Sequence, residues 1–344
     1  MIRKDYSNYK IIYITGGLGF IGMNLIFKLL EDPYNLIFVI DNEVYGSRQK
    51  ILQKNTLMNH PRVHISYLNI CNTEELCEDI QTQLAIYHLK KIDEIYHLAG
   101  IASPIWYKIY PEETLDVSYI GTKNIFNIAH KYHSKVLICS SSEVYGDPES
   151  SPQSETYFGN VNCYGERSCY DEGKRIMESL AYTFQKKYHL DIKIVRIFNT
   201  YGPYMNIDDG RVIPSFIKSY LQDLPITIFN NGTQTRSFNY MDDTINGMIS
   251  LMNSTVIEPM NIGNEYEISI CEFYEILKEI IKVYFPKYHK DEKEVIYGFS
   301  DNDDPKLRRA NVTKAKTLLN YESKTKLEEG LIKTIQYFID YQDC

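Results

Sequence analysis

The sequence has no apolar run long enough to cross a membrane. A transmembrane helix needs about 18 or more consecutive apolar residues, and the apolar stretches here, such as "NLIFVI", are far shorter. The first residues, "MIRKDYSNYK", also lack the apolar core of a signal peptide. These absences predict a protein that lies in the cytoplasm and does not insert into a membrane.

Basic charge and paired cysteines are scarce as well. The 45 Asp and Glu outnumber the 37 Lys and Arg, which gives a net charge of -8, whereas non-specific binding of nucleic acid needs a basic face. We therefore expect no nucleic-acid partner. The seven Cys form no C-x-x-C pair and have no His pair nearby. The sequence thus predicts neither a disulfide framework nor a metal site.

The sequence does contain a regular alternation of short apolar runs and longer segments with helical spacing. The runs "KIIYIT", "NLIFVIDN", "IDEIYHLAG", "KVLICSSS" and "IKIVRIFN" have the length and composition of buried strands. This alternation predicts an α/β fold, a Rossmann-type doubly wound parallel sheet. It loosens after about residue 200, which predicts a smaller C-terminal α/β domain that binds the substrate. We assign 1–199 and about 240–262 to the first domain, and about 200–239 and 263–344 to the second.

A glycine-rich segment, "TGGLGFIG", follows the first predicted strand. Gly16, Gly19 and Gly22 lie between a strand and a helix, where missing side chains permit a tight turn and a close approach to a pyrophosphate. Asp41 ends the next strand, where a carboxylate accepts hydrogen bonds from the adenosine ribose and repels a 2′-phosphate. The pattern predicts NAD in preference to NADP. An ordinary glycine turn with a surface Asp is the alternative.

Hydroxyls and a carboxylate gather after another predicted strand, in "SSSEVYGD", at the sheet edge where open α/β sheets bind ligands. Downstream, "YDEGK" places Tyr170 and Lys174 on one face of a helix. A free phenol has a pKa of about 10, and a nearby cation lowers it, so such a pair can supply a base near neutral pH. The alternative is a chance pair on a solvated helix, because the chain contains 30 Tyr.

In this order, "TGGLGFIG", "SSSEVYG" and "YDEGK" resemble the extended short-chain dehydrogenase/reductase family of nucleotide-sugar enzymes. Longer stretches are more specific. These are similar to the UDP-glucuronate decarboxylase branch of that family: "SSSEVYGDPESSPQSETYFGNVNCYGERSCYDEGKR", "RIFNTYGPYMNIDDGRVIPSF", "GTQTRSFNYMDD" and "DDPKLRRANVTKAKTLLNYE". The resemblance extends from about residue 10 to about residue 335.

The resemblance implies a role for each matching residue. Ser141 hydrogen-bonds the sugar hydroxyl that is oxidised, Tyr170 is the base, and Lys174 holds the nicotinamide ribose. Ser142 and Glu143 fill the positions where related 4,6-dehydratases carry Asp and Glu; a serine is a poor acid for expelling a hydroxyl, which favours decarboxylation. The implied NAD contacts are Gly16, Gly19, Phe20, Ile21, Gly22, Asp41, Asn42, Leu98, Ala99, Tyr170 and Lys174.

The same resemblance implies the reaction and the partners. Carbon 4 of UDP-glucuronate is oxidised with NAD, carbon dioxide is lost, carbon 5 is reprotonated, and reduction of the ketone gives UDP-xylose. Glu143 orders a water for that protonation or presses against the carboxylate, and a carboxylate that caps a turn is a third alternative. The helix of Tyr170 pairs with its copy, which implies a homodimer. The implied contacts of the diphosphate or sugar are Asn199, Arg211, Arg236 and Arg308, with Arg236 alternatively on the sugar carboxylate.

Departures from the family pattern keep other functions open. They occur at Asn69, at Gly100 with Ile101, and at Ser118. One alternative is another enzyme that oxidises carbon 4 of a UDP- or GDP-sugar: a 4-epimerase, a 4-dehydrogenase or a 4,6-dehydratase. The other is a non-enzymatic NAD-binding sensor. The complete set of serine, tyrosine and lysine argues against the sensor, and Glu143 argues against an epimerase.

Overall fold

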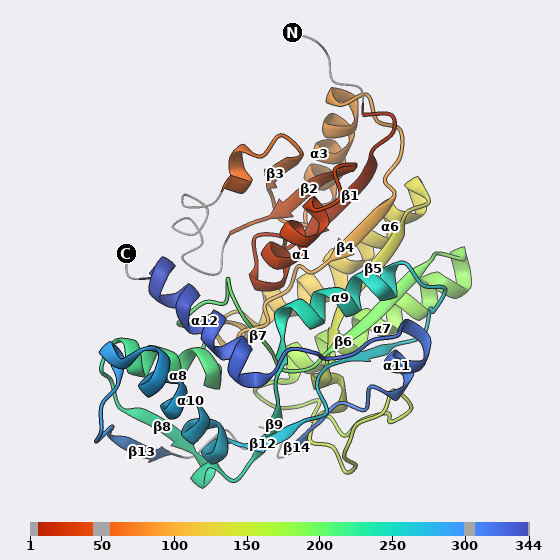
Figure 1. Ribbon diagram of the computed structural model, residues 1–344. Coiled ribbons are helices and arrows are strands. Elements are labelled where there is room, and N and C mark those ends of the chain that lie inside the picture. The colour runs from red at the N-terminus through yellow and green to blue at the C-terminus, as the bar shows by residue number, and fades with distance from the viewer. Residues whose placement is uncertain (1–5, 44–55, 299–306, 343–344) are drawn as a thin grey trace.

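A computed structural model describes residues 6–43, 56–298 and 307–342 of the chain. Its largest element is a parallel sheet (Figure 1) that consists of β1 (Lys10–Thr15), β2 (Asn35–Asp41), β3 (Val63–Tyr67), β4 (Glu94–His97), β5 (Lys135–Ser141), β6 (Ile192–Ile197) and β11 (Met260–Ile262). The seven strands have the order β11-β6-β5-β4-β1-β2-β3, and every pair is parallel. The chain therefore winds outward in both directions from β1 and β4, and the predicted doubly wound sheet is confirmed.

Both faces of this sheet are covered by helices, which explains why its strands read as continuous apolar runs. In β1, Ile12 and Ile14 point into one layer, and Ile11 and Tyr13 point into the other. The first layer contains α1 (Phe20–Leu30), α9 (Met241–Met252) and α11 (Thr313–Leu319). The opposite layer contains α3 (Thr73–Ile86), α6 (Thr122–Tyr132) and α7 (Ser168–Tyr188).

Short helices lead into α6. They are α4 (Pro104–Ile109), α5 (Pro111–Asp116) and a π-helical segment, Val117–Gly121. Ser118 lies in the π-helical segment and its hydroxyl donates to the carbonyl of Thr114 at 2.7 Å. A Cβ at Gly173 of α7 would lie 2.8 Å from this hydroxyl. The small residues at both positions therefore allow α7 to pack closely against the neighbouring helix.

The remaining elements form a smaller α/β region. Its strands are β7 (Thr200–Tyr201), β8 (Ile226–Phe229), β9 (Thr235–Ser237), β10 (Asn239–Tyr240), β12 (Glu267–Ser269), β13 (Val295–Gly298) and β14 (Leu307–Arg308), and its helices are α8 (Val212–Leu221), α10 (Ile270–Tyr284) and α12 (Leu327–Gln342). The strands pair as β10-β7, β12-β9-β14 and β13-β8, and the helices supply a separate apolar cluster. The segment "VIPSFIKSYL" forms α8, and the apolar run "ITIF" forms β8. The domain boundaries stay a prediction.

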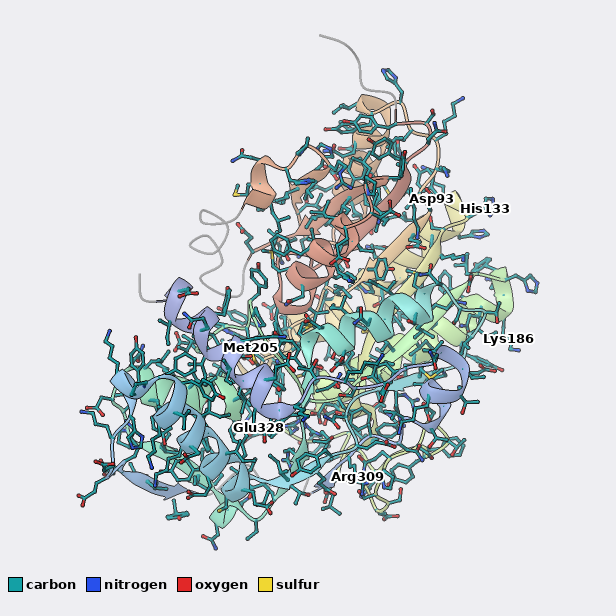
Figure 2. All side chains as sticks on the ribbon, in the orientation of Figure 1. Asp93, His133, Lys186, Met205, Arg309 and Glu328 are labelled. Atoms are coloured by element: carbon teal, nitrogen blue, oxygen red, sulfur yellow. The ribbon has the colours of Figure 1, made fainter. Side chains whose placement is uncertain are left out.

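The carboxyl ends of the parallel strands lie toward the smaller region. Asp93 immediately precedes β4 and His133 lies two residues before β5, so both mark the far edge of the sheet, whereas Met205 lies where the sheet meets the smaller region (Figure 2). Met205 is buried and lines two cavities at this junction. The fold therefore brings the loops that follow the strands next to the arginine-bearing segments of the smaller region.

Three further observations apply to the ranges that the structure describes. None of their helices has both the length and the apolar character that a membrane span requires. Within the same ranges, no group of three or more His, Cys, Asp or Glu side chains is arranged to hold a metal ion. The cysteines in these ranges, Cys71, Cys77, Cys139, Cys163, Cys169 and Cys271, have free thiols.

Candidate active site

Two adjoining cavities lie at the carboxyl ends of the sheet strands. The first, of about 680 Å³, lies at the reversal of strand order between β1 and β4, where open α/β sheets bind ligands. It is lined by Gly16, Gly19, Phe20, Ile21, Gly22, Asp41, Asn42, Leu98 and Ala99, all predicted NAD contacts. The second, of about 590 Å³, is lined by the other predicted residues: Ser141, Ser142, Glu143, Tyr170, Lys174, Asn199, Arg211, Arg236 and Arg308. Arg211 lines both cavities.

The first cavity is shaped by the backbone of the glycine-rich loop. Gly16 has φ +67°, and a Cβ there would lie 2.6 Å from the backbone that follows β4. A Cβ at Gly22 would lie 2.5 Å from the backbone of Gly17. The buried carboxylate of Asp41 accepts a hydrogen bond from the backbone nitrogen of Leu18 at 3.0 Å. The loop therefore lies close to two strand ends, and a Cβ at Gly16 or Gly22 would clash with backbone.

These features fit NAD. At Gly19, where α1 begins, no side chain in the described part of the chain caps the helix. The first backbone N–H groups of α1 are thus left for an anion, which the helix dipole also favours. Gly19 lines the cavity at this helix end, and Asp41 lines it at the end of β2, where the adenosine ribose is bound in such folds.

In the second cavity, Ser141 lies at the end of β5 beside Tyr170 of α7. The Ser141 hydroxyl lies close enough to the phenol to lower the pKa of Tyr170. Burial raises the pKa of Tyr170 to about 12, although the Ser141 hydroxyl and the charge of Arg211 oppose this rise. Without a further cation, the phenol is therefore protonated at neutral pH and donates hydrogen bonds.

Lys174 lies one helical turn after Tyr170 and is buried. Its ammonium is 5.6 Å from the centre of the Tyr170 ring and donates to the carbonyl of Cys139 at 2.8 Å. Burial lowers the pKa of Lys174, while Cys139 and Glu178 oppose the effect. The spacing of four residues thus places the two side chains on one helix face, as the sequence indicates.

Glu143 is a buried carboxylate held between two arginines. Arg308 Nη2 lies 2.8 Å from its Oε1, and Arg167 Nη2 lies 2.8 Å from its Oε2. Burial alone would raise the pKa of Glu143, but the charges of Arg308 and Arg167 outweigh burial and lower it. Glu143 is therefore ionised at neutral pH. Its own backbone nitrogen donates to the Ser141 hydroxyl at 3.3 Å, so Ser141, and not the carboxylate of Glu143, caps the turn.

The substrate-side residues come from well-separated segments. Arg308 of β14 also donates from Nη1 to Asn199 Oδ1 at 3.2 Å, so Arg308 contacts both Asn199 and Glu143. Arg211 donates from Nη2 to the carbonyl of Ala102 at 2.9 Å. Arg236 is buried in β9 and donates to the carbonyl of Thr235 at 2.8 Å. The second cavity therefore collects positive charge around one carboxylate.

The sequence interpretation missed two residues of this site. Arg167 immediately precedes α7. The sequence shows only an arginine three residues before Tyr170, and its pairing with Glu143 becomes visible only in the folded structure. Tyr107 of α4 stacks on Tyr170, with ring centres 5.2 Å apart and planes 11° apart. Its buried hydroxyl has no hydrogen-bond partner within the described residues and lines the second cavity. No local pattern distinguishes Tyr107 from the many other tyrosines.

Together, the fold and the first cavity define an NAD-binding protein of the extended short-chain dehydrogenase/reductase class. The chain belongs to the NAD dependent epimerase/dehydratase family, whose model matches residues 12–263. It is 41% identical to UDP-glucuronic acid decarboxylase 6 of Arabidopsis thaliana, over 94% of this chain and 87% of that protein. It is 40% identical to UDP-glucuronic acid decarboxylase 1 of Xenopus tropicalis, over 96% of this chain and 72% of that protein.

A solved structure adds a related enzyme with a different activity. UDP-glucuronic acid 4-epimerase from Bacillus cereus, in complex with UDP-glucuronic acid and NAD, superposes with a TM-score of 0.79 at 27% sequence identity. The match covers 96% of this chain and 99% of that one. Similarity of fold therefore includes both decarboxylases and epimerases, and the side chains of the second cavity must distinguish between them.

Proposed function

We propose that this protein decarboxylates UDP-glucuronate to UDP-xylose and uses NAD catalytically. The arrangement of Glu143 carries the proposal. Held between Arg308 and Arg167, it is an ionised carboxylate and therefore not the acid that a dehydratase needs to expel a hydroxyl. The similarity to the decarboxylases of Arabidopsis thaliana and Xenopus tropicalis supports the same reaction.

NAD supplies the hydride acceptor at carbon 4 and the hydride donor that later reduces the ketone. Gly16, Gly19 and Gly22 would hold its pyrophosphate at the start of α1, and Asp41 its adenosine ribose. Lys174 would bind the nicotinamide ribose. The other residues proposed to contact NAD are Phe20, Ile21, Asn42, Leu98, Ala99 and Tyr170.

Tyr170 removes the proton of the carbon 4 hydroxyl, and Ser141 orients that hydroxyl. The high pKa of the buried phenol must fall for this step, and the positive charges of Lys174 and the oxidised nicotinamide act in that direction. The oxidised sugar has a ketone β to its carboxylate. When the bond to the carboxylate breaks, its electron pair passes to the ketone oxygen, where the hydroxyls of Tyr170 and Ser141 stabilise the negative charge.

The carboxylate end of the sugar meets Glu143 and its arginines in this proposal. Carbon dioxide leaves, and carbon 5 then takes a proton. Because Glu143 is ionised, it acts either by ordering a water that delivers this proton or by pressing against the substrate carboxylate. Ser142, the residue before Glu143 in the chain, lines the same cavity. Arg211, Arg236 and Asn199 would bind the diphosphate or the sugar, since guanidinium groups suit phosphate oxygens.

We also propose that two copies form a homodimer in the cytoplasm. Large apolar side chains are exposed on α5, on the π-helical segment and on α7: Leu115, Tyr119, Ile120, Ile176 and Tyr182. These elements pack against one another. Two such surfaces would form a four-helix bundle, and the arrangement buries these side chains. Light scattering that gives only the monomer mass at micromolar concentration would contradict the dimer.

The proposed function is tested by incubating the protein with UDP-glucuronate and a small amount of NAD, followed by mass spectrometry of the product. We expect UDP-xylose, lighter than the substrate by one carbon dioxide, in large excess over the NAD supplied. Accumulation of one NADH for each product would indicate release of the ketone. Absence of any product from UDP-glucuronate, with turnover of another nucleotide sugar, contradicts the proposal.

A 4-epimerase is the second candidate, because the Bacillus cereus enzyme shares the fold and binds UDP-glucuronic acid. An epimerase would return a product of unchanged mass, which the same spectrum detects. Ionised Glu143 beside two arginines favours the decarboxylase, since inversion at carbon 4 requires no group at the carboxylate end.

A further inference from the structure

Glu178 and Arg196 form a partly buried ion pair next to the strand that carries Ser141. The two carboxylate oxygens of Glu178 accept hydrogen bonds from Arg196 Nε at 2.9 Å and Nη2 at 2.7 Å. Glu178 belongs to α7 and Arg196 to β6, so the pair joins the catalytic helix to the sheet. Burial alone lowers the pKa of Arg196, but the contacts with Glu178 and Tyr145 raise it well above its usual value. Arg196 is therefore always charged.

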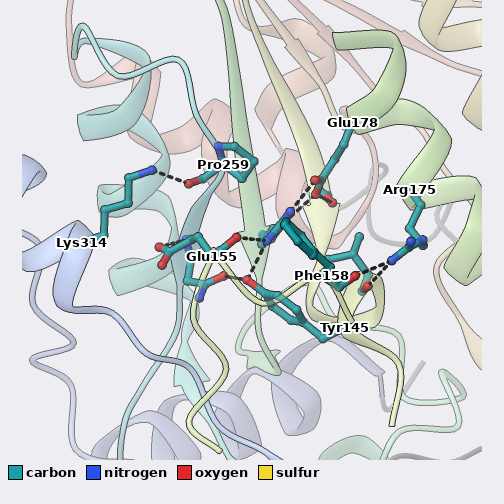
Figure 3. Close-up of polar contacts among 11 residues, drawn as sticks. Tyr145, Glu155, Phe158, Arg175, Glu178, Pro259 and Lys314 are labelled. Atoms are coloured by element: carbon teal, nitrogen blue, oxygen red, sulfur yellow. Dashed lines mark hydrogen bonds and ion pairs between the residues drawn. The ribbon is translucent and has the colours of Figure 1, made fainter. Parts of the chain in front are cut away.

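This pair holds both ends of segment 140–145, which contains the proposed sugar contacts. At the first end, the Ser140 hydroxyl donates to Glu178 Oε1 at 2.5 Å. At the last end, Arg196 Nη1 donates to the Tyr145 hydroxyl at 2.8 Å, which in turn donates to a side-chain oxygen of β11 at 2.7 Å. Figure 3 shows Glu178 and Tyr145 within this network. A change at Glu178 is thus transmitted to both flanks of the segment.

Glu178 also lies in line with the proposed base. Tyr170, Lys174 and Glu178 follow at intervals of four residues, which places them along one face of α7. Arg175, the residue after Lys174 on the same helix, donates from Nη1 to the carbonyl of Val144 at 3.0 Å (Figure 3). The helix that carries the base and the strand end that carries the serine are therefore joined at two places.

The groups that face the Lys174 ammonium come from three elements. They are Cys139 of β5, His97 of β4, and Tyr170 and Glu178 of α7. Burial, together with Lys174, lowers the pKa of His97 to about 3, and burial raises the pKa of Cys139 to about 12. His97 and Cys139 are therefore neutral at neutral pH. Glu178 supplies the negative charge in this set.

We infer that Glu178 is a positioning residue: its one carboxylate holds Ser141 against Tyr170 through Ser140 and Arg196, and places negative charge beside Lys174. The inference rests on the proposed function for the identity of the substrate. It assigns two separable effects to Glu178, a geometric one through Ser140 and an electrostatic one on Lys174.

Ser140→Ala isolates the geometric effect. It removes one hydrogen bond and leaves every charge in place. We expect hydride transfer in a single turnover, followed by NADH absorbance, to slow about tenfold to a hundredfold, because small displacements of reacting groups have effects of this size. The pH at which the rate changes should stay as in the wild type.

Glu178→Gln isolates the electrostatic effect, since it preserves the shape of the side chain. Glu178 raises the pKa of Lys174, so without its charge Lys174 loses its proton at a lower pH. The alkaline limb of the hydride-transfer rate should therefore move to lower pH. NAD affinity, measured by calorimetry across the same pH range, should weaken at the same lower pH, which provides a readout independent of turnover.

Glu172→Gln is the matched control, because Glu172 is on the same helix and pairs with Arg175 at 3.5 Å near the surface. It should reproduce the wild-type pH profile. If Glu178→Gln fails to fold, Ser140→Ala still tests the geometric effect. A wild-type protein that forms no NADH from UDP-glucuronate contradicts the proposed function. This inference alone is contradicted if the wild-type protein forms NADH, Ser140→Ala forms it at the wild-type rate, and Glu178→Gln keeps the wild-type pH profile.

Discussion

The two cavities differ in what forms their walls. The first, which fits NAD, is shaped by backbone: the glycine-rich loop, the start of α1 and the ends of β1, β2 and β4. The second is shaped by charged side chains, with Glu143 held by Arg167 and Arg308, which enter from distant segments. A backbone cradle suits a cofactor common to a whole family. Side chains are easier to replace and determine which sugar reacts and how.

The comparison predicts that single substitutions in the second cavity affect chemistry most. The largest effect is expected for Tyr170→Phe, which removes the group that deprotonates the carbon 4 hydroxyl. Loss of one acid–base group costs about a hundredfold to ten-thousandfold in rate. No NADH should form in a single turnover, while NAD should still bind in calorimetry. A wild-type rate of NADH formation would show that another residue is the base.

Arg308→Gln should reduce stability and activity together. Breaking a buried ion pair typically costs about 3–5 kcal/mol, which urea unfolding can measure at neutral pH. Arg308 lowers the pKa of Glu143 below its usual 4.5, so their attraction contributes fully above that pH and is lost as the pH falls through the lowered pKa. The difference in unfolding free energy between wild type and variant should therefore shrink in acid. A difference that stays constant with pH would contradict the ion pair.

Gly16→Ala tests the backbone side of the comparison and should have a smaller effect on the free energy. The residue has φ +67°, a conformation that costs about 1–2 kcal/mol for a residue with a Cβ, and the new Cβ would meet the backbone after β4. We expect weaker NAD binding in calorimetry and a lower melting temperature. Retention of wild-type NAD affinity would show that the cofactor does not need this close approach.

The same contrast explains how much could be predicted from the sequence. The sheet and the glycine-rich loop depend on local patterns, so the doubly wound fold and the α8 helix were predictable. Arg308 stays a predicted contact of the diphosphate or sugar, but its ion pair with Glu143 was not predicted, because it depends on a two-residue strand, β14, that pairs with β9. Such a short pairing has no periodicity in the sequence. Arg167 and Tyr107 were missed for the same reason: their contacts with Glu143 and Tyr170 exist only once α4 and α7 have packed.

The central claim is that oxidation at carbon 4 precedes the loss of the carboxylate and that Glu143 serves the later steps. Glu143→Gln tests it most directly in a single turnover with UDP-glucuronate, followed by NADH absorbance and by release of carbon dioxide. We predict that NADH forms and then persists far longer than in the wild type, while carbon dioxide or UDP-xylose appears slowly. NADH that decays at the wild-type rate, or carbon dioxide released before any NADH, would contradict the account.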